Sequence, residues 1–145
     1  LIEKAVEHRV SSIFVFNGEK STFKYDDQKK FLKLIAESSK QSFLCNFPKF
    51  SFINIKDIPL KNTLVFDFQG TSSLKEELKK KLNSVNIVFG PDTGFSQNEK
   101  KFFHETFFSV VNLGNTVFRF ETAALYVLSS INYEYERLLK NYPLE

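Results

Sequence analysis

The chain has 145 residues, the size of one domain, and 42% of them are hydrophobic, including 18 phenylalanines, so it can bury a sizeable core. Its net charge of +3 is modest, and only Arg9, Arg119 and Arg137 among its cationic residues are arginine, which argues against a strongly basic nucleic-acid surface. The single cysteine, Cys45, excludes an internal disulfide, and no apolar run reaches the length of a transmembrane helix.

We therefore expect a cytoplasmic protein that occupies no membrane.

The start of the sequence has a further feature. Residues Leu1–Glu7 have the pattern of a helix already under way, with no capping residue before it and no initiator methionine. This pattern predicts a fragment that lacks an N-terminal part.

Strand-like and helix-like segments alternate along almost the whole chain. In chain order we expect a strand over Val10–Phe16, a helix from Asp26 or Asp27 to about Ser39, a strand over Ser42–Phe47 that includes Cys45, an irregular stretch over 49–61, a strand over Asn62–Phe68, a helix over Ser73–Asn83, a strand over Val85–Phe89, a helix that starts at Ser96, a strand over Phe108–Asn112 and a helix from Glu121 to about Lys140. This order predicts an α/β fold with a mainly parallel sheet and helices on both of its faces.

Two of these helices carry clearer signals than the rest. Ser96 followed by Glu99 forms a capping box, and the helix after it is expected to bury Phe102, Phe103 and Phe107. The last helix has an apolar stripe at helical spacing, formed by Ala124, Val127, Leu128, Ile131, Tyr135 and Leu138.

Two glycine-containing loops follow expected strands, and ligands of parallel sheets bind beyond the carboxyl ends of strands. The first loop is Gly90-Pro91-Asp92-Thr93-Gly94-Phe95-Ser96, where a helix N-terminus suits an anionic group. A tight turn with a good helix cap explains it equally well. The second loop runs from Leu113 to Phe120 and carries Arg119, which either serves a site or simply pairs with Glu121 or covers a helix end.

Together the two loops resemble the C-terminal motifs of the SPOUT class of methyltransferases, most closely those of the RsmE family, which methylates N3 of a uridine in 16S ribosomal RNA. The family's Gly-Pro-Glu-Gly-Gly-Phe-Ser-x-x-Glu motif reads here as residues Gly90–Glu99. Its Leu-Gly-x-Arg-Ile-Leu-Arg-x-Glu-Thr-Ala motif reads as Leu113–Ala123. Two weaker matches, Lys4–Val10 and Glu37–Ser42, extend the resemblance over nearly the whole chain.

The resemblance implies a fold and partners that the residue pattern does not show. It implies that residues 1–145 form a SPOUT catalytic domain with a C-terminal trefoil knot. It also implies a homodimer packed through the knotted region, and a separate N-terminal RNA-binding barrel domain that this sequence does not contain. The implied partner is ribosomal RNA or the small ribosomal subunit.

The resemblance further implies a cofactor, S-adenosylmethionine, with S-adenosylhomocysteine as the product. The cofactor-binding residues would be Phe66, Asp67, Phe68, Gly90, Pro91, Asp92, Gly94, Leu113, Gly114, Asn115, Val117, Phe118, Thr122 and Ala123. Among them, Leu113, Val117 and Phe118 would enclose the adenine and methionine portions. No group of residues has the spacing of metal ligands, so no metal is expected.

Catalysis is assigned to Arg119 and Glu121. Deprotonation of uracil N3 spreads negative charge onto the flanking carbonyl oxygens, and a fixed cation such as Arg119 would stabilise that charge or grip the target phosphate. Glu121 would orient Arg119 or take part in removing the proton.

Three departures from the family pattern favour other functions. Asp92-Thr93 replaces the family's Glu-Gly, and Thr116 and Leu44 stand where the family carries arginine. Lost arginines weaken phosphate contacts before cofactor binding, so a non-catalytic RNA-binding or dimerisation module that keeps the fold is the main alternative. A nucleotide-binding enzyme ranks last, because the first loop lacks the lysine and hydroxyl of a P-loop.

Overall fold

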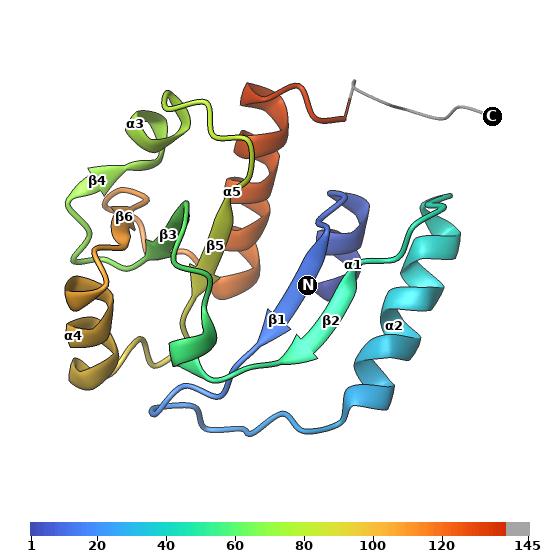
Figure 1. Cartoon of the computed structure of the whole chain (residues 1–145), viewed down its shortest axis with the longest axis horizontal. Coiled ribbons are helices and arrows are strands. Elements are labelled where there is room, and N and C mark those ends of the chain that lie inside the picture. The colour runs from blue at the N-terminus through green and yellow to red at the C-terminus, as the bar shows by residue number, and fades with distance from the viewer. Residues whose placement is uncertain (139–145) are drawn as a thin grey trace.

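A computed structural model of the chain describes residues 1–138 and shows an α/β fold (Figure 1). In chain order the elements are α1 (Ile2–Glu7), β1 (Ser12–Val15), α2 (Gln28–Gln41), β2 (Lys49–Phe52), the 3-10 helix η1 (Ile55–Asp57), β3 (Thr63–Phe66), β4 (Ser72–Ser73), α3 (Leu74–Leu78), β5 (Asn86–Phe89), α4 (Gln97–Glu105), β6 (Ser109–Asn112) and α5 (Phe120–Glu134). The expected alternation of strands and helices is confirmed.

The strands form two parallel sheets rather than one. β1 pairs with β2, with Ser12 opposite Lys49, and a larger sheet has the order β4-β6-β3-β5. Every pairing between the described strands is parallel. The small sheet lies beside α2 on one side of the molecule, and the four-stranded sheet lies on the other (Figure 1). β3 is central and buried along its whole length, as its continuous apolar run predicts.

Helices cover both faces of the four-stranded sheet. On one face, α3 and α5 pack over a cluster formed by Leu64, Phe66, Leu74, Leu78, Val111, Val127 and Ile131. On the other face, α4 packs over a second cluster formed by Ile58, Val65, Val88, Phe95, Phe103 and Phe108. Successive residues of β3 thus serve opposite cores, because side chains alternate across a strand.

The expected strand over Ser42–Phe47 is wrong, and the strand lies later, at Lys49–Phe52. The chain cannot extend directly after α2, because Phe43 adopts a left-handed conformation with φ of 53°. The Phe43 N–H donates to the Lys40 carbonyl, and the Leu44 N–H donates to the Ser39 carbonyl, which is the Schellman pattern that closes a helix. Phe43 is therefore 91% exposed, and Cys45 lies exposed in the loop.

The expected burial of Phe107 is also wrong, for the same physical reason. Phe107 follows α4 with φ of 58°, and the N–H groups of Phe107 and Phe108 donate to the carbonyls of His104 and Phe103. This turn directs Phe107 into solvent, where it is 92% exposed, whereas Phe103 and Phe108 are buried.

Two helices are shorter than expected. α3 ends at Leu78, where the Tyr135 hydroxyl donates to the Leu78 carbonyl at 3.2 Å and accepts from the Leu82 N–H at 3.4 Å. α5 ends at Glu134, so Tyr135 is half-buried and Leu138 is exposed. The expected end of this helix at about Lys140 falls outside the described residues. Among residues 1–138, no helix is long and apolar enough to cross a membrane.

Candidate functional site

Three loops converge at the carboxyl edge of the four-stranded sheet. β3, β5 and β6 are adjacent and parallel, and Phe66 of β3 lies opposite both Phe89 of β5 and Val111 of β6. The strands therefore end at one level, and the loops that follow them, 67–71, 90–96 and 113–119, start side by side. The structure thus brings together the segments that hold the predicted cofactor-binding residues.

The glycine loop, residues 90–96, is a tight turn fixed to the start of α4. The Gly94 N–H donates to the Pro91 carbonyl at 2.7 Å, and Gly94 has a φ of 75° that favours glycine. A side chain at Gly90 would lie 3.1 Å from the ring of the buried Phe95. This geometry therefore favours glycine at both positions, the first because space is tight and the second because of the backbone conformation.

The predicted capping box at the start of α4 is confirmed. The Glu99 N–H donates to Ser96 Oγ at 3.1 Å, and the Ser96 N–H donates to Glu99 Oε2 at 2.7 Å. Both residues are buried, at 7% and 3% exposure. This buried capping box holds the glycine loop against the start of α4, whereas a solvent-exposed cap would only satisfy the helix end.

The loop after β6 exposes its backbone. Gly114 has a φ of 116° with open space where a side chain would be, and its N–H donates to Asn112 Oδ1 at 2.7 Å. Within residues 1–138, the N–H groups of residues 115–118 donate no hydrogen bond to the protein. Residues 115–117 are exposed and Phe118 is half-buried, so these unpaired donors are available to a polar ligand.

Asn112, which the sequence analysis missed, joins two of the loops. Its Nδ2 donates to the Phe68 carbonyl at 2.7 Å while its Oδ1 accepts from Gly114. The only signal in the sequence is a polar side chain at the end of an apolar strand.

The loop after β3, residues 67–71, crosses β6 in close contact. The N–H groups of Asp67 and Thr71 donate to the carbonyls of Val111 and Val110, each at 3.1 Å. A side chain at Gly70 would lie 2.5 Å from the backbone carbon of Val111. The backbones of the two segments therefore leave no room for a side chain at Gly70.

The carboxylate of Asp67 is already occupied within the protein. Its Oδ1 accepts from Lys100 Nζ at 3.3 Å and from the Gln69 N–H at 2.9 Å, and Lys100 Nζ also donates to Gln69 Oε1 at 3.1 Å. Lys100, another residue that the sequence analysis missed, thus fastens this loop to α4.

Several aromatic rings line the edge. Phe66 stacks on Phe89 with ring centroids 4.8 Å apart, and Phe89 meets Phe120 edge-on at 5.8 Å. Phe118 stacks on Tyr126 at 5.9 Å. Phe66 itself is buried in the core, so only its backbone can reach a ligand. The remaining predicted binding residues are exposed or half-buried, except Ala123, which is buried in α5.

The two predicted catalytic residues lie together at the start of α5. Arg119 is the N-cap residue and Glu121 lies in the first turn, and both are exposed. In the described part of the chain, neither side chain forms a hydrogen bond or an ion pair. Arg119 and Glu121 therefore do not pair with each other. Arg119 is free to meet an anionic group at this edge.

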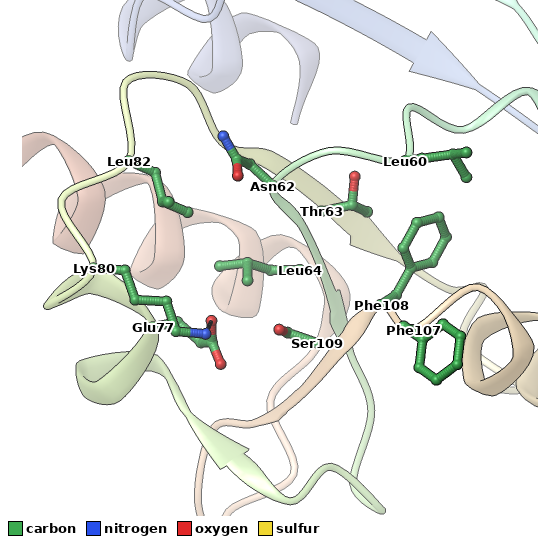
Figure 2. A pocket seen from close by; sticks show the side chains of 10 residues that line it. All are labelled: Leu60, Asn62, Thr63, Leu64, Glu77, Lys80, Leu82, Phe107, Phe108 and Ser109. Atoms are coloured by element: carbon green, nitrogen blue, oxygen red, sulfur yellow. Dashed lines mark hydrogen bonds and ion pairs between the residues drawn. The ribbon is translucent and has the colours of Figure 1, made fainter.

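Two hollows lie near this sheet. One, a pocket of about 160 Å³, lies at the opposite, amino end of β3 and β6 (Figure 2). There Lys80 Nζ contacts the buried Glu77 carboxylate at 2.6 Å. A groove of about 500 Å³ runs along α4 from Asp67 and Phe95 toward Phe107. Of these two hollows, the groove is the one that reaches the edge where the glycine loop lies, at Phe95. Among residues 1–138, no group of histidine, cysteine and acidic side chains could hold a metal ion.

Residues 1–132 match the family model described as an RNA methyltransferase domain. The chain belongs to this family. The ribosomal RNA small subunit methyltransferase E of Bacillus subtilis is 28% identical to it, over 95% of this chain and 61% of that protein. The protein of the same name from Mesomycoplasma hyopneumoniae is 31% identical, over 88% of this chain and 60% of that protein. These relatives confirm the resemblance to the RsmE family.

Solved structures of methyltransferases share the fold. A predicted RNA methyltransferase from Thermotoga maritima aligns with a TM-score of 0.73 and 28% identity, over 94% of this chain and 58% of that one. The ribosomal RNA small subunit methyltransferase E of Neisseria gonorrhoeae, solved with bound S-adenosylmethionine, aligns with a TM-score of 0.80 and 20% identity, over 90% and 59%. The chain thus spans about three fifths of the length of these methyltransferases.

The residues that depart from the family pattern lie in loops of the fold. Thr116 is exposed in the loop before α5, and Leu44 is half-buried at the end of α2. Thr93 is exposed in the glycine loop, and its Oγ1 donates to the Lys20 carbonyl at 2.8 Å. The family's glycine at this position has no side chain and cannot form that bond.

Proposed function

We propose that this chain is the catalytic domain of an enzyme that methylates N3 of a uridine in 16S ribosomal RNA with S-adenosylmethionine as the methyl donor. The observation that carries the proposal is the convergence of the glycine loop and the loop after β6 at one edge of a parallel sheet. The family membership supports RNA methylation, and the names of the relatives support the small-subunit RNA as substrate.

The residues at this edge fit the proposed cofactor. Gly94 and Gly114 leave open space where side chains would stand, and the N–H groups of residues 115–118 face no acceptor within the described chain. Leu113, Val117 and Phe118 provide apolar surface for the adenine. When bound, the cofactor supplies an electrophilic methyl group, and the loops hold it in line with the acceptor, which lowers the entropic cost of the reaction.

Arg119 and Glu121 are the proposed catalytic pair. Uracil N3 becomes nucleophilic when its proton leaves, and the negative charge then spreads to the carbonyl oxygens. The exposed Arg119 guanidinium stabilises that charge. Glu121 orients Arg119 or accepts the proton.

The proposal includes a trefoil knot and a homodimer packed through it. The knot is supported by the strand order, because β6 lies between β3 and β4, so the connection 67–71 has to pass across β6. The chain leaves β6 directly beside that connection, where Asn112 holds the Phe68 carbonyl. Sedimentation equilibrium tests the dimer, and a monomer at micromolar concentration would contradict it.

Calorimetry with S-adenosylmethionine tests the proposal. We expect saturable binding, and no heat of binding at millimolar cofactor would refute a catalytic role. In the full-length enzyme, Arg119→Ala should lower kcat by roughly 100-fold while leaving cofactor affinity nearly unchanged, because one charge-stabilising donor is lost. Arg119→Lys, which keeps the charge, should recover part of the rate. Equal losses in rate and affinity would show that Arg119 binds the cofactor instead.

A non-catalytic RNA-binding or dimerisation module is the second candidate function. The observation that favours it is the replacement of family arginines by Thr116 and Leu44, neither of which can pair with a phosphate. This module would bind RNA or dimerise normally and give no methyl transfer, even with saturating cofactor.

A further inference from the structure

The segment 17–25, between β1 and α2, is fastened both to the glycine loop and to the first turn of α4. The Glu19 N–H donates to Glu99 Oε1 at 2.9 Å, and the Lys20 carbonyl accepts from Thr93 Oγ1 at 2.8 Å. Asn98 Nδ2 donates to Glu19 Oε2 at 3.3 Å. A side chain at Gly18 would lie 3.2 Å from Glu99 Oε1 and 3.3 Å from Pro91 Cδ. The segment is therefore held against the glycine loop and the start of α4.

Glu99 is the centre of this attachment. Its Oε2 completes the capping box of α4, while its Oε1 reaches the Glu19 N–H of the segment, 80 positions away in sequence. Glu76 forms a capping box of the same type with Ser73 at the start of α3, but it is exposed and holds no second segment. The chain thus contains a matched pair of capping glutamates, only one of which joins two parts of the fold.

The segment also has a defined shape of its own. Asn17 closes it, because its Oδ1 accepts from the Tyr25 N–H at 2.9 Å and its Nδ2 donates to the Tyr25 carbonyl at 3.2 Å. The Ser21 N–H donates to the Gly18 carbonyl at 3.0 Å. Between these ties the side chain of Phe23 is 74% exposed, and Lys20 and Lys24 are exposed beside it.

An exposed phenylalanine between lysines on a fixed loop has the chemistry of a single-stranded RNA contact. Aromatic rings stack on unpaired bases of any sequence, and lysines neutralise the phosphates beside them. The acidic groups nearby are partly engaged, since Glu19 accepts from Asn98 and Asp27 caps α2, while Asp26 stays exposed. Phe23 is three residues beyond Lys20, at most about 10 Å along the chain from it, and the Lys20 carbonyl meets Thr93 of the glycine loop.

We propose that the segment 17–25 is an RNA-contacting arm. Glu99 and Thr93 hold it beside the glycine loop, so that it presents the RNA strand that carries the target base to this loop. The inference deepens the proposed function and rests on it for the identity of the nucleic acid. A glycine at the position of Thr93, as in the family's motif, could not form the bond to the Lys20 carbonyl.

Binding of a fluorescein-labelled, uridine-containing RNA of about 12 nucleotides, followed by anisotropy over a salt series, tests the contact. We expect Phe23→Ala to weaken binding by about 5- to 150-fold, the range for loss of one stacked base. We expect Lys20→Ala/Lys24→Ala to flatten the plot of log affinity against log salt by about 1.4, or 0.7 per lost charge. Lys33→Ala/Lys101→Ala, which removes two exposed lysines elsewhere, is the matched control and should leave affinity within about twofold.

The attachment is tested separately. Glu99→Gln leaves one acceptor oxygen for two N–H donors, so the Glu19 amide or the Ser96 amide should exchange its hydrogen faster, while Glu76→Gln should leave both unchanged. Thr93→Val, which keeps the shape and removes the hydroxyl, should weaken RNA binding by about fivefold, and Thr93→Ser should not.

The outcomes distinguish the arm from the proposed function. If the cofactor binds but the Phe23 and double-lysine variants bind RNA as the parent does, the arm is wrong and the methyltransferase proposal stands. The arm is also refuted if the parent chain fails to bind the oligonucleotide at low salt. If RNA binding depends on the arm but the cofactor does not bind, the arm stands and the catalytic proposal falls.

Discussion

Replacing Gly70 by alanine tests how tightly the loop after β3 is packed on β6. The added carbon would lie 2.5 Å from the Val111 backbone carbon, 2.6 Å from the Asn112 nitrogen and 2.8 Å from the Val110 oxygen. Ordinary contact needs about 3.5 Å or more, so the loop has to move by roughly 1 Å. That shift lengthens the two bonds from the loop to Val110 and Val111, now 3.1 Å each, beyond hydrogen-bonding range.

Each of these two bonds contributes about 1 kcal/mol, and the overpacked contact costs about 1–3 kcal/mol more, so we expect Gly70→Ala to lower the free energy of unfolding by about 3–5 kcal/mol. Because the chain has no tryptophan, urea unfolding should be followed by far-ultraviolet circular dichroism. Gly94→Ala is the control, since its φ of 75° is unfavourable to alanine but no atom lies within 4 Å, and it should cost only about 1–2 kcal/mol. A loss below 1 kcal/mol at Gly70 would refute the reasoning, because it would mean that the loop can yield without breaking its bonds.

Three further predictions concern other parts of the fold. Phe43→Gly should raise the free energy of unfolding by about 0.5–1 kcal/mol in urea, since a 91% exposed side chain is removed from a left-handed position, and a decrease would contradict this. Burial lowers the pKa of His8 below its usual 6.5, and the Asn132 Nδ2 atom lies 2.9 Å from His8 Nδ1. As the pH falls, His8 therefore gains its proton in the unfolded chain before it does so in the folded chain. The free energy of unfolding should therefore decrease as the pH drops through 6.5 and level off below the folded pKa. In His8→Asn that part of the pH dependence should disappear, and an unchanged pH profile would exclude His8 as its source. Asn112→Ala, which removes the bonds to Phe68 and Gly114, should weaken S-adenosylmethionine binding in calorimetry by about tenfold, and unchanged affinity would show that these loops need no such tie.

Local sequence signals predicted several elements correctly because the physics that produces them is local. The Ser96–Glu99 capping box and the Asp27 cap of α2 each depend on atoms within three residues of one another. The apolar run of β3 marks a strand buried on both faces. The strand expected over Ser42–Phe47 failed because the competing helix closure places Phe43 in a conformation that no sequence rule assigns to phenylalanine.

The sequence by itself determined the family, the α/β alternation and the two glycine loops, because motifs and periodicity are encoded in neighbouring residues. Only the tertiary structure decided which strands lie side by side, and hence that the loops 67–71, 90–96 and 113–119 share one edge. Gly70 shows the difference most clearly, since its φ lies outside the left-handed region and its requirement comes entirely from the backbone of β6, about 40 positions away. The same holds for Glu99, which reads in sequence as an ordinary helix cap, while the fold alone brings its second oxygen to Glu19.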